Sequence, residues 1–187
     1  MKEPITFNYS IPQKNNNMAN FVFNHIFIKG TKQSIVDFIN RGLKGCNSKV
    51  RISADLSGEQ IADRLNGHGC PITMQSYQPI GISEYAPLDL WKVKYETDKG
   101  LCLSFQLIDA LEDPTPFLRY INGFDGITVY AYGFDSPFYS SWYQYNGQKN
   151  EVIKQNVMEK LNTTDSEATY KILEGYVQDF LKKLDKA

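Results

Sequence analysis

Three cysteines and two histidines are the residues of this sequence with the most obvious chemistry. Cys46, His68 and Cys70 could supply soft ligands to zinc, and Cys70 with His25 or His68 could form a nucleophilic pair. Zinc sites usually show tighter paired spacing and need a fourth ligand, and nothing in the sequence places a histidine against a cysteine. Free thiols and ordinary histidines explain these residues better, so we expect no metal and no cofactor.

Two further segments have the composition of small binding sites. Residues 30–32, Gly-Thr-Lys, stand at an expected helix start, where free backbone N–H groups can hold an anion, but a plain N-cap explains Thr31. Asp109, Glu112 and Asp113 cluster where a strand is expected to run into a helix, and acidic groups there complement the helix dipole. We therefore assign no catalytic residue to either segment.

The stretch from Ile127 to Gly147 contains eight aromatic residues in one predicted β-hairpin. Aromatic side chains at every second position line one face of a strand, where they must meet a core, a partner or a stacked ligand. If the aliphatic residues of the neighbouring strands face helices, the opposite sheet face carries an aromatic and basic platform. Its candidate ligand- or partner-binding residues are Phe27, Lys29, Lys92, Lys94, Tyr130 and Tyr132. RNA-binding modules stack bases on such a surface.

In a competing interpretation, a helix covers this platform. The net charge is −1 and the pI is about 6.1, so the chain as a whole is not attracted to nucleic acid, and the K/R-G-F/Y-G/A-F signature is missing. A helix predicted from about Asp165 to Leu184 carries an apolar stripe through Tyr170, Leu173, Val177 and Phe180. We predict that this helix packs on its own domain or on a second copy and buries part of the aromatic hairpin.

The order of the predicted elements indicates the fold class. Alternating apolar and polar residues predict strands at 24–29, 72–80, 90–97, 101–108 and 127–134. Helical spacing and capping residues predict helices at 32–43, 57–65, 115–122, 150–161 and 165–184. We expect an α+β fold, a ferredoxin-like sandwich with a mainly antiparallel sheet, helices on one face and an added C-terminal helix. On this interpretation, the side chains of Trp91, Val93 and Tyr95 face the helices.

Several blocks of the sequence resemble a known family. Residues 18–30, MANFVFNHIFIKG, are similar to the opening of the YubB-like ferredoxin-fold family, small proteins carried by plasmids, phages and other mobile elements. Trp91 within a strand, Pro114 and Pro116 after a Phe-bearing strand, and the segment 137–147 are similar to the middle and C-terminal blocks of that family.

The resemblance covers roughly residues 18–147 and has departures. The family's Asn-Trp-Gly-Thr-Lys block is reduced to Leu-Trp-Lys at 90–92, and its Trp-Ser-Pro-Pro segment becomes Ala-Leu-Glu-Asp-Pro at 110–114, so the chain resembles a divergent member. The resemblance implies a fold, a cytoplasmic location and a mobile-element context, and it carries over no functional residue. It also predicts that residues 1–17 are an N-terminal extension of a single domain at 18–187, with a helical extension from about 150.

The remaining features bound the functional class. The 187 residues, 42% of them hydrophobic, can bury the core of one domain. Apolar runs fall short of the ~20 residues of a membrane span, and the odd cysteine count suits a reducing compartment, so we expect a cytoplasmic protein that does not bind membranes. We expect a non-catalytic accessory or binding protein of a bacterial mobile element, monomeric or homodimeric, with a protein partner. The alternatives are a single-stranded nucleic-acid-binding module and an enzyme with a Cys/His site.

Overall fold

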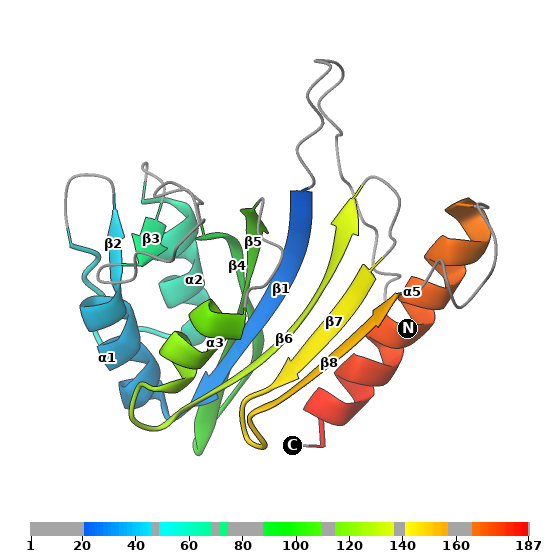
Figure 1. Ribbon diagram of the computed structural model, residues 1–187. Coiled ribbons are helices and arrows are strands. Elements are labelled where there is room, and N and C mark those ends of the chain that lie inside the picture. Colours follow the sequence, from blue (N-terminus) through cyan, green and yellow to red (C-terminus); the bar gives the residue numbers. More distant parts are fainter. Residues whose placement is uncertain are drawn as a thin grey trace, which may run out of the picture.

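A single antiparallel sheet organises the protein (Figure 1). The computed structural model describes residues 21–45, 49–68, 72–74, 88–109, 115–136, 141–156 and 166–186. The strands are β1 (Phe21–Gly30), β2 (Leu43–Gly45), β3 (Ile72–Met74), β4 (Leu88–Thr97), β5 (Gly100–Asp109), β6 (Ile127–Ser136), β7 (Ser141–Asn146) and β8 (Glu151–Asn156). Their order is β2-β3-β4-β5-β1-β6-β7-β8, with every neighbouring pair antiparallel. The α+β class and the antiparallel sheet predicted from the sequence are confirmed.

Strand β1 occupies the centre because both of its faces are apolar. Ile26 and Ile28 are fully buried on one face, and Phe27 is buried on the other. The strand pairs with β5 on one side and with β6 on the other, so that Phe27 lies opposite Tyr130. At its end, a Cβ on Gly30 would overlap the carbonyl oxygen of Gly126, so this close approach requires glycine.

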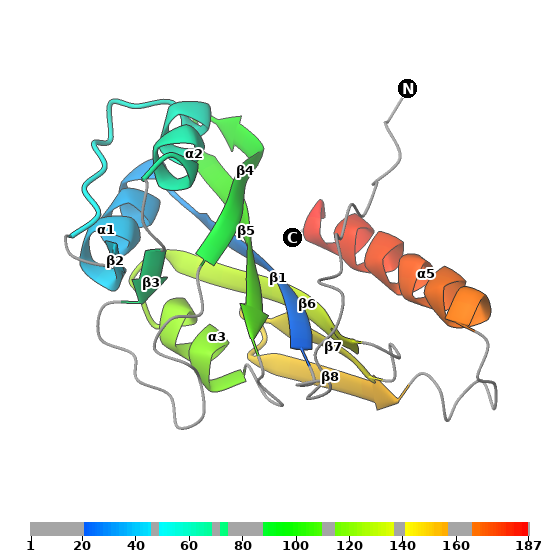
Figure 2. The ribbon, with the colours of Figure 1, turned by 90° about the horizontal axis from the view of Figure 1, so that it is seen from above.

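Three helices cover one face of the sheet, here called the three-helix face (Figure 2). They are α1 (Lys32–Gly42), α2 (Gly58–Asn66) and α3 (Thr115–Asn122), and α1 and α3 were predicted to share a face. The Thr31 hydroxyl accepts from the Ser34 N–H at 3.1 Å, and Ser57 with Gln60 forms the predicted capping box of α2. These caps satisfy N–H groups that a helix start leaves unpaired, which fixes where the two helices begin.

Asparagine side chains tie these helices to loops and strands. The Asn40 side chain on α1 exchanges two hydrogen bonds with the backbone of Ile52, at 2.7 and 2.8 Å. Asn66 at the end of α2 does the same with the backbone of Trp91, with both bonds at 2.8 Å. Asn122 at the end of α3 accepts from the Val129 N–H at 2.9 Å. Each of these side chains satisfies backbone groups of a loop or strand, so the layer is held by polar as well as apolar contacts.

The helix α5 (Ser166–Leu184) packs on the opposite side of the sheet, the α5 face (Figure 2). Leu173, Val177, Phe180 and Leu184 recur at helical spacing and are all buried. They contact the aromatic rings of β1, β6 and β7, so of the two predicted alternatives, its own domain or a second copy, the helix packs on its own domain. The Tyr170 side chain lies outside the described residues. None of the described helices is long and apolar enough to cross a membrane.

The helix predicted at 150–161 is wrong over residues 151–156, which form β8. The segment EVIKQN lacks clean alternation, but the turn after Asn146 returns the chain antiparallel to β7, with Tyr145 opposite Val152. Asn150 takes a positive φ of 50° in this turn, a conformation that asparagine tolerates. Pairing with β7 thus decides the structure of this segment over local helix propensity.

Some predicted features lie outside the described residues. These are the extension 1–17, the rest of the strand predicted at 72–80 after Met74, the acidic residues Glu112 and Asp113, and the capping residues Thr164 and Asp165.

Candidate functional site

The α5 face is a layer of closely packed aromatic rings. The Tyr132 ring is central: its centroid lies 5.3 Å from that of Trp142 and 5.2 Å from that of Phe180 on α5. Phe27 packs beside them, 5.8 Å from Phe180. The buried members of this aromatic layer are Phe27, Tyr130, Tyr132, Phe134 and Trp142 from the sheet and Leu173, Val177, Phe180 and Leu184 from α5.

The structure divides the predicted platform into two parts. Its aromatic residues Phe27, Tyr130 and Tyr132 come together as predicted, but they are 3 to 6% exposed and lie beneath α5. Lys92 and Lys94 are exposed on β4, and Lys94 forms an ion pair with Asp185 just beyond α5, with 3.3 Å between nitrogen and oxygen. The lysines therefore stand beside the aromatic layer, and the buried rings of Phe27, Tyr130 and Tyr132 offer bases no open face in this arrangement.

Tyr95 lies on the opposite face from the one predicted. The pairing of β4 with β5 shifts register between Val93 and Tyr95, which leaves Lys94 as an extra residue. Such a bulge reverses the alternation of side chains after it. Val93 therefore packs with the three-helix face, while Tyr95 lies opposite Cys102 and packs with the α5 face.

His25 belongs to the α5 face as a stacked ring. Its imidazole lies parallel to the Tyr132 ring, with 4.8 Å between centroids, and the Gln106 side chain lies 3.5 Å from its Nδ1. Burial, and then the charge of Lys92, lowers the His25 pKa from 6.5 to about 4. The ring is neutral at physiological pH and is a weak base.

Cys102 is a buried free thiol on the same face. Burial raises its pKa to about 12, against the opposing influence of Lys29 and Lys94. Because the thiolate is the nucleophile and the metal ligand, a thiol that stays protonated at neutral pH is poorly suited to either role.

The other soft groups of the sequence form no site within the described residues. No group of three or more His, Cys, Asp or Glu side chains in the described part of the chain could hold a metal ion. Cys46 and Cys70, predicted as possible partners of His68, lie outside the described residues. At residues 30–32, Lys32 forms an ion pair with Glu96 at 2.5 Å, while Glu96 accepts from the Gly58 N–H at 2.7 Å. This segment thus joins the starts of α1 and α2.

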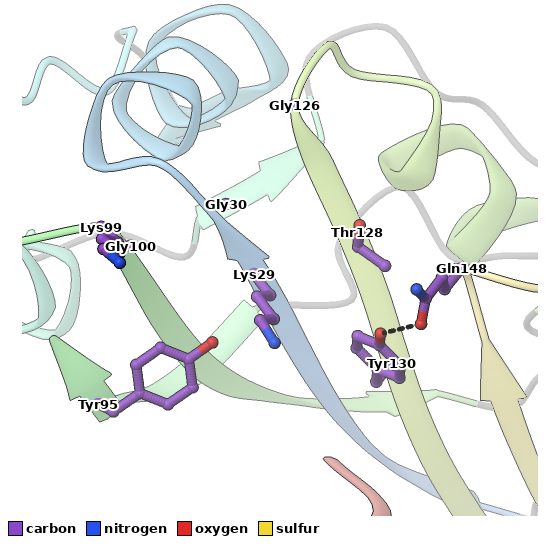
Figure 3. A pocket seen from close by; sticks show the side chains of 9 residues that line it. All are labelled: Lys29, Gly30, Tyr95, Lys99, Gly100, Gly126, Thr128, Tyr130 and Gln148. Atoms are coloured by element: carbon purple, nitrogen blue, oxygen red, sulfur yellow. Dashed lines mark hydrogen bonds between the residues drawn. The ribbon is translucent and has the colours of Figure 1, made fainter. Parts of the chain in front are cut away.

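A polar pocket opens at the end of the sheet where four turns meet (Figure 3). It has a volume of about 270 Å³ and is lined by Lys29, Gly30, Tyr95, Lys99, Gly100, Gly126, Thr128, Tyr130 and Gln148. Its floor follows one row of the sheet, in which Lys29 lies between Cys102 and Thr128. Lys29 projects between Tyr95 and Tyr130, and its ammonium lies 5.8 Å from the centre of the Tyr95 ring (Figure 3).

Sequence reasoning found two residues of this polar pocket and missed the others. Lys29 and Tyr130 were candidates as members of the platform. Tyr95 had been assigned to the other face, while Lys99 and Gln148 stand in turns that are distant in the sequence. The alternation of β6 places Thr128 on the same face as Tyr130, and this signal could have extended the candidate list toward the sheet end.

Comparisons of the chain with known protein families, with curated proteins and with solved structures found no match. The function must therefore be argued from the residues themselves.

Proposed function

We propose that this chain is a cytoplasmic, non-catalytic accessory or binding protein of a bacterial mobile element. The observation that carries the proposal is the burial of the aromatic face by α5. A sheet face that would otherwise be the natural place for a substrate or a nucleic acid is filled by the chain's own Phe180 and its neighbours. The protein then acts through what remains exposed around this layer.

The titration of the buried groups supports a non-catalytic role. His25 has a pKa of about 4 and Cys102 a pKa of about 12, so at neutral pH neither provides an efficient base or a thiolate. Both side chains serve the packing of the α5 face. The mobile-element context rests on the resemblance of residues 18–147 to YubB-like proteins.

We also propose that the central strands form a ferredoxin-like unit. In chain order, β1, β4, β5 and β6 give the antiparallel order β4-β5-β1-β6, with α1 and α2 between β1 and β4 and α3 between β5 and β6. This is the arrangement of a split βαβ sandwich. On this interpretation, β2, β3, β7, β8 and α5 are additions around the unit.

The runner-up function is single-stranded nucleic-acid binding. The convergence of Phe27, Tyr130 and Tyr132, with Lys92 and Lys94 nearby, favours it, because base stacking and phosphate attraction would act together there. Bases could reach these rings only if α5 left the sheet. The loss of apolar burial opposes that displacement.

Titration with a single-stranded oligonucleotide tests the choice between these functions. We expect the full chain to show no salt-dependent binding to the aromatic face, and Tyr132→Ala to leave any weak signal unchanged. Binding that weakens with salt and is lost in Tyr132→Ala would promote the runner-up. The genetic context tests the mobile-element part: the coding sequence should lie among plasmid or phage genes and be missing from strains that lack the element.

A further inference from the structure

The polar pocket gathers hydrogen-bond donors and positive charge. Lys29 and Lys99 contribute two ammonium groups, and its lining residues include no carboxylate. Among the described residues, no carboxylate lies within 4.0 Å of either ammonium. Lysines that line a concave surface without a carboxylate partner raise the local concentration of anions.

The neutral residues of the polar pocket add donors of fixed direction. The Tyr130 hydroxyl donates to Gln148 Oε1 at 3.4 Å, which leaves the Gln148 NH₂ group as a donor. Burial, with a smaller influence from Cys102, raises the Tyr95 pKa to about 12, so its hydroxyl keeps its proton at neutral pH. The nearby Asp185 carboxylate is engaged with Lys94. The positive charge of the pocket is therefore not neutralised by its neighbour.

The backbone at the rim permits close approach. Gly30 ends β1, Gly100 begins β5 and Gly126 precedes β6, and all three line the pocket. A Cβ at Gly30 would overlap the Gly126 carbonyl oxygen and one at Gly126 would overlap Ser34 Oγ, so these glycines let the backbone segments around the opening pack closely together. The volume of about 270 Å³ exceeds that of a single oxyanion and lies near the lower end of small-ligand sites, roughly 300 Å³.

We propose that the polar pocket binds the phosphate group of a small phosphorylated ligand, of the size of a sugar phosphate or a mononucleotide. Lys29 and Lys99 would flank the phosphate, and the Tyr95 ring would form one wall for the attached organic group. The inference deepens the proposed binding function and rests on it. It names a site that lies beside the aromatic layer and leaves α5 in place.

Binding to the full chain tests the site directly. Inorganic phosphate, adenosine monophosphate and a short oligothymidylate are titrated separately at constant ionic strength, with amide NMR shifts and calorimetry as readouts. We expect the shifts to centre on the amides of Gly30, Gly100 and Gly126, with adenosine monophosphate binding more tightly than inorganic phosphate. Lys29→Gln and Lys99→Gln should each weaken binding about tenfold or more, since each removes a charged hydrogen-bond donor to the phosphate.

Lys44→Gln is the matched control, because Lys44 is charged and, like Lys99, exposed but lies on β2, at the far edge of the sheet. It should bind like the parent protein. Lys99 is exposed in a turn, so Lys99→Gln should fold normally, and circular dichroism with thermal unfolding checks this for every variant. Equal binding by Lys99→Gln and Lys44→Gln, or amide shifts scattered over the surface, would overturn the site.

The three ligands separate the sources of the phosphate. Tighter binding of adenosine monophosphate supports the proposal. If the affinity for oligothymidylate exceeds that for adenosine monophosphate by a factor larger than its number of phosphates, the site is a nucleic-acid site and the proposal is replaced. No binding of any ligand would refute the pocket but leave the accessory function standing. Release of phosphate from adenosine monophosphate, lost in Lys29→Gln, would support the site and overturn the non-catalytic function.

Discussion

The two faces of the sheet are covered in different ways. On the three-helix face, α1, α2 and α3 connect strands of the sheet, and asparagine hydrogen bonds tie their ends to the backbone. On the α5 face, one helix follows the last described strand, and its contacts with the sheet include apolar and ring packing and the ion pair between Lys94 and Asp185. The helices α1, α2 and α3 are thus part of the connections between strands. Helix α5 can loosen without breaking such a connection, so its local stability can be lower.

Two phenylalanine truncations test this difference with the largest expected effect. Phe38 on α1 is fully buried and packs edge-on against Phe124, while Phe180 on α5 is 6% exposed. Phe38→Ala should lower the free energy of global unfolding toward the upper end of about 3–5 kcal/mol. Phe180→Ala should also lower the free energy of unfolding by about 3–5 kcal/mol, and this loss should first weaken the docking of α5.

Urea unfolding and amide hydrogen exchange measure the two losses. After Phe180→Ala, amides of α5 should exchange much faster than those of β1 and β5. After Phe38→Ala, the protection of both regions should fall together. Uniform loss of protection after Phe180→Ala would show that the two covers form one cooperative unit.

Acid should weaken the α5 face through His25. Its folded pKa of about 4 lies below the unfolded value of 6.5, so as the pH falls through this window the unfolded chain takes up a proton that the folded protein does not. The free energy of unfolding should therefore fall by up to about 3 kcal/mol between pH 6.5 and 4, with no such loss above pH 6.5.

Comparison with His25→Gln isolates this contribution from that of the carboxylates. Urea unfolding at pH 7, 5.5 and 4 should give a steeper decline for the parent protein than for the variant. Parallel pH profiles would contradict the assigned pKa.

Gly133→Ala should disturb the three-helix face from the sheet side. A Cβ at Gly133 would overlap the Tyr143 ring and lie 2.8 Å from the Phe23 carbonyl oxygen. Tyr143 donates a hydrogen bond to Asn24, whose buried amide donates to the Leu107 carbonyl at 3.1 Å. We expect a loss of about 1–3 kcal/mol from overpacking, measured by thermal unfolding. Tyr143→Phe keeps the ring and removes only the hydroxyl, so a larger loss in Tyr143→Phe would assign the effect to the hydrogen bond.

The smallest expected effect is a gain in stability. Gly175 stands within α5, and a Cβ there would have no atom within 4 Å. Gly175→Ala should stabilise the helix by about 0.5–1 kcal/mol and slow the exchange of α5 amides, because alanine loses less backbone entropy. Gln178→Ala, at another exposed position of α5, should change little. If Gly175→Ala left the stability of the protein and the exchange of α5 amides unchanged, the stability of α5 itself would not limit its docking.

Local pattern predicts most of this fold, and pairing decides the rest. Alternation predicted the four central strands, and the spacing from Leu173 to Leu184 predicted a helix that must be covered. The side chosen by Tyr95 depends on a bulge in β4, and the same strand has a second register shift between Asp89 and Lys92. Leu90 takes a positive φ of 54° within that shift, and a leucine in the sequence does not predict this conformation.

The candidate site was less predictable than the fold. The polar pocket is assembled from turns, and only the strand register brings Lys29, Thr128 and Tyr95 into one row. Lys99 and Gln148 carry no local signal of this neighbourhood. Periodicity revealed the platform rings and the apolar stripe of the helix that covers them, but the choice between docking on its own sheet and docking on a second copy depends on the complete tertiary fold.

The position of α5 after the described strands has a consequence for synthesis on the ribosome. The aromatic rings of β1, β6 and β7 are made before the helix that buries them. At about 5–20 residues per second, the chain from Trp142 to Leu184 takes seconds to complete. During that interval the nascent sheet exposes its aromatic rings, and chaperones would bind the protein there until Phe180 has been synthesised.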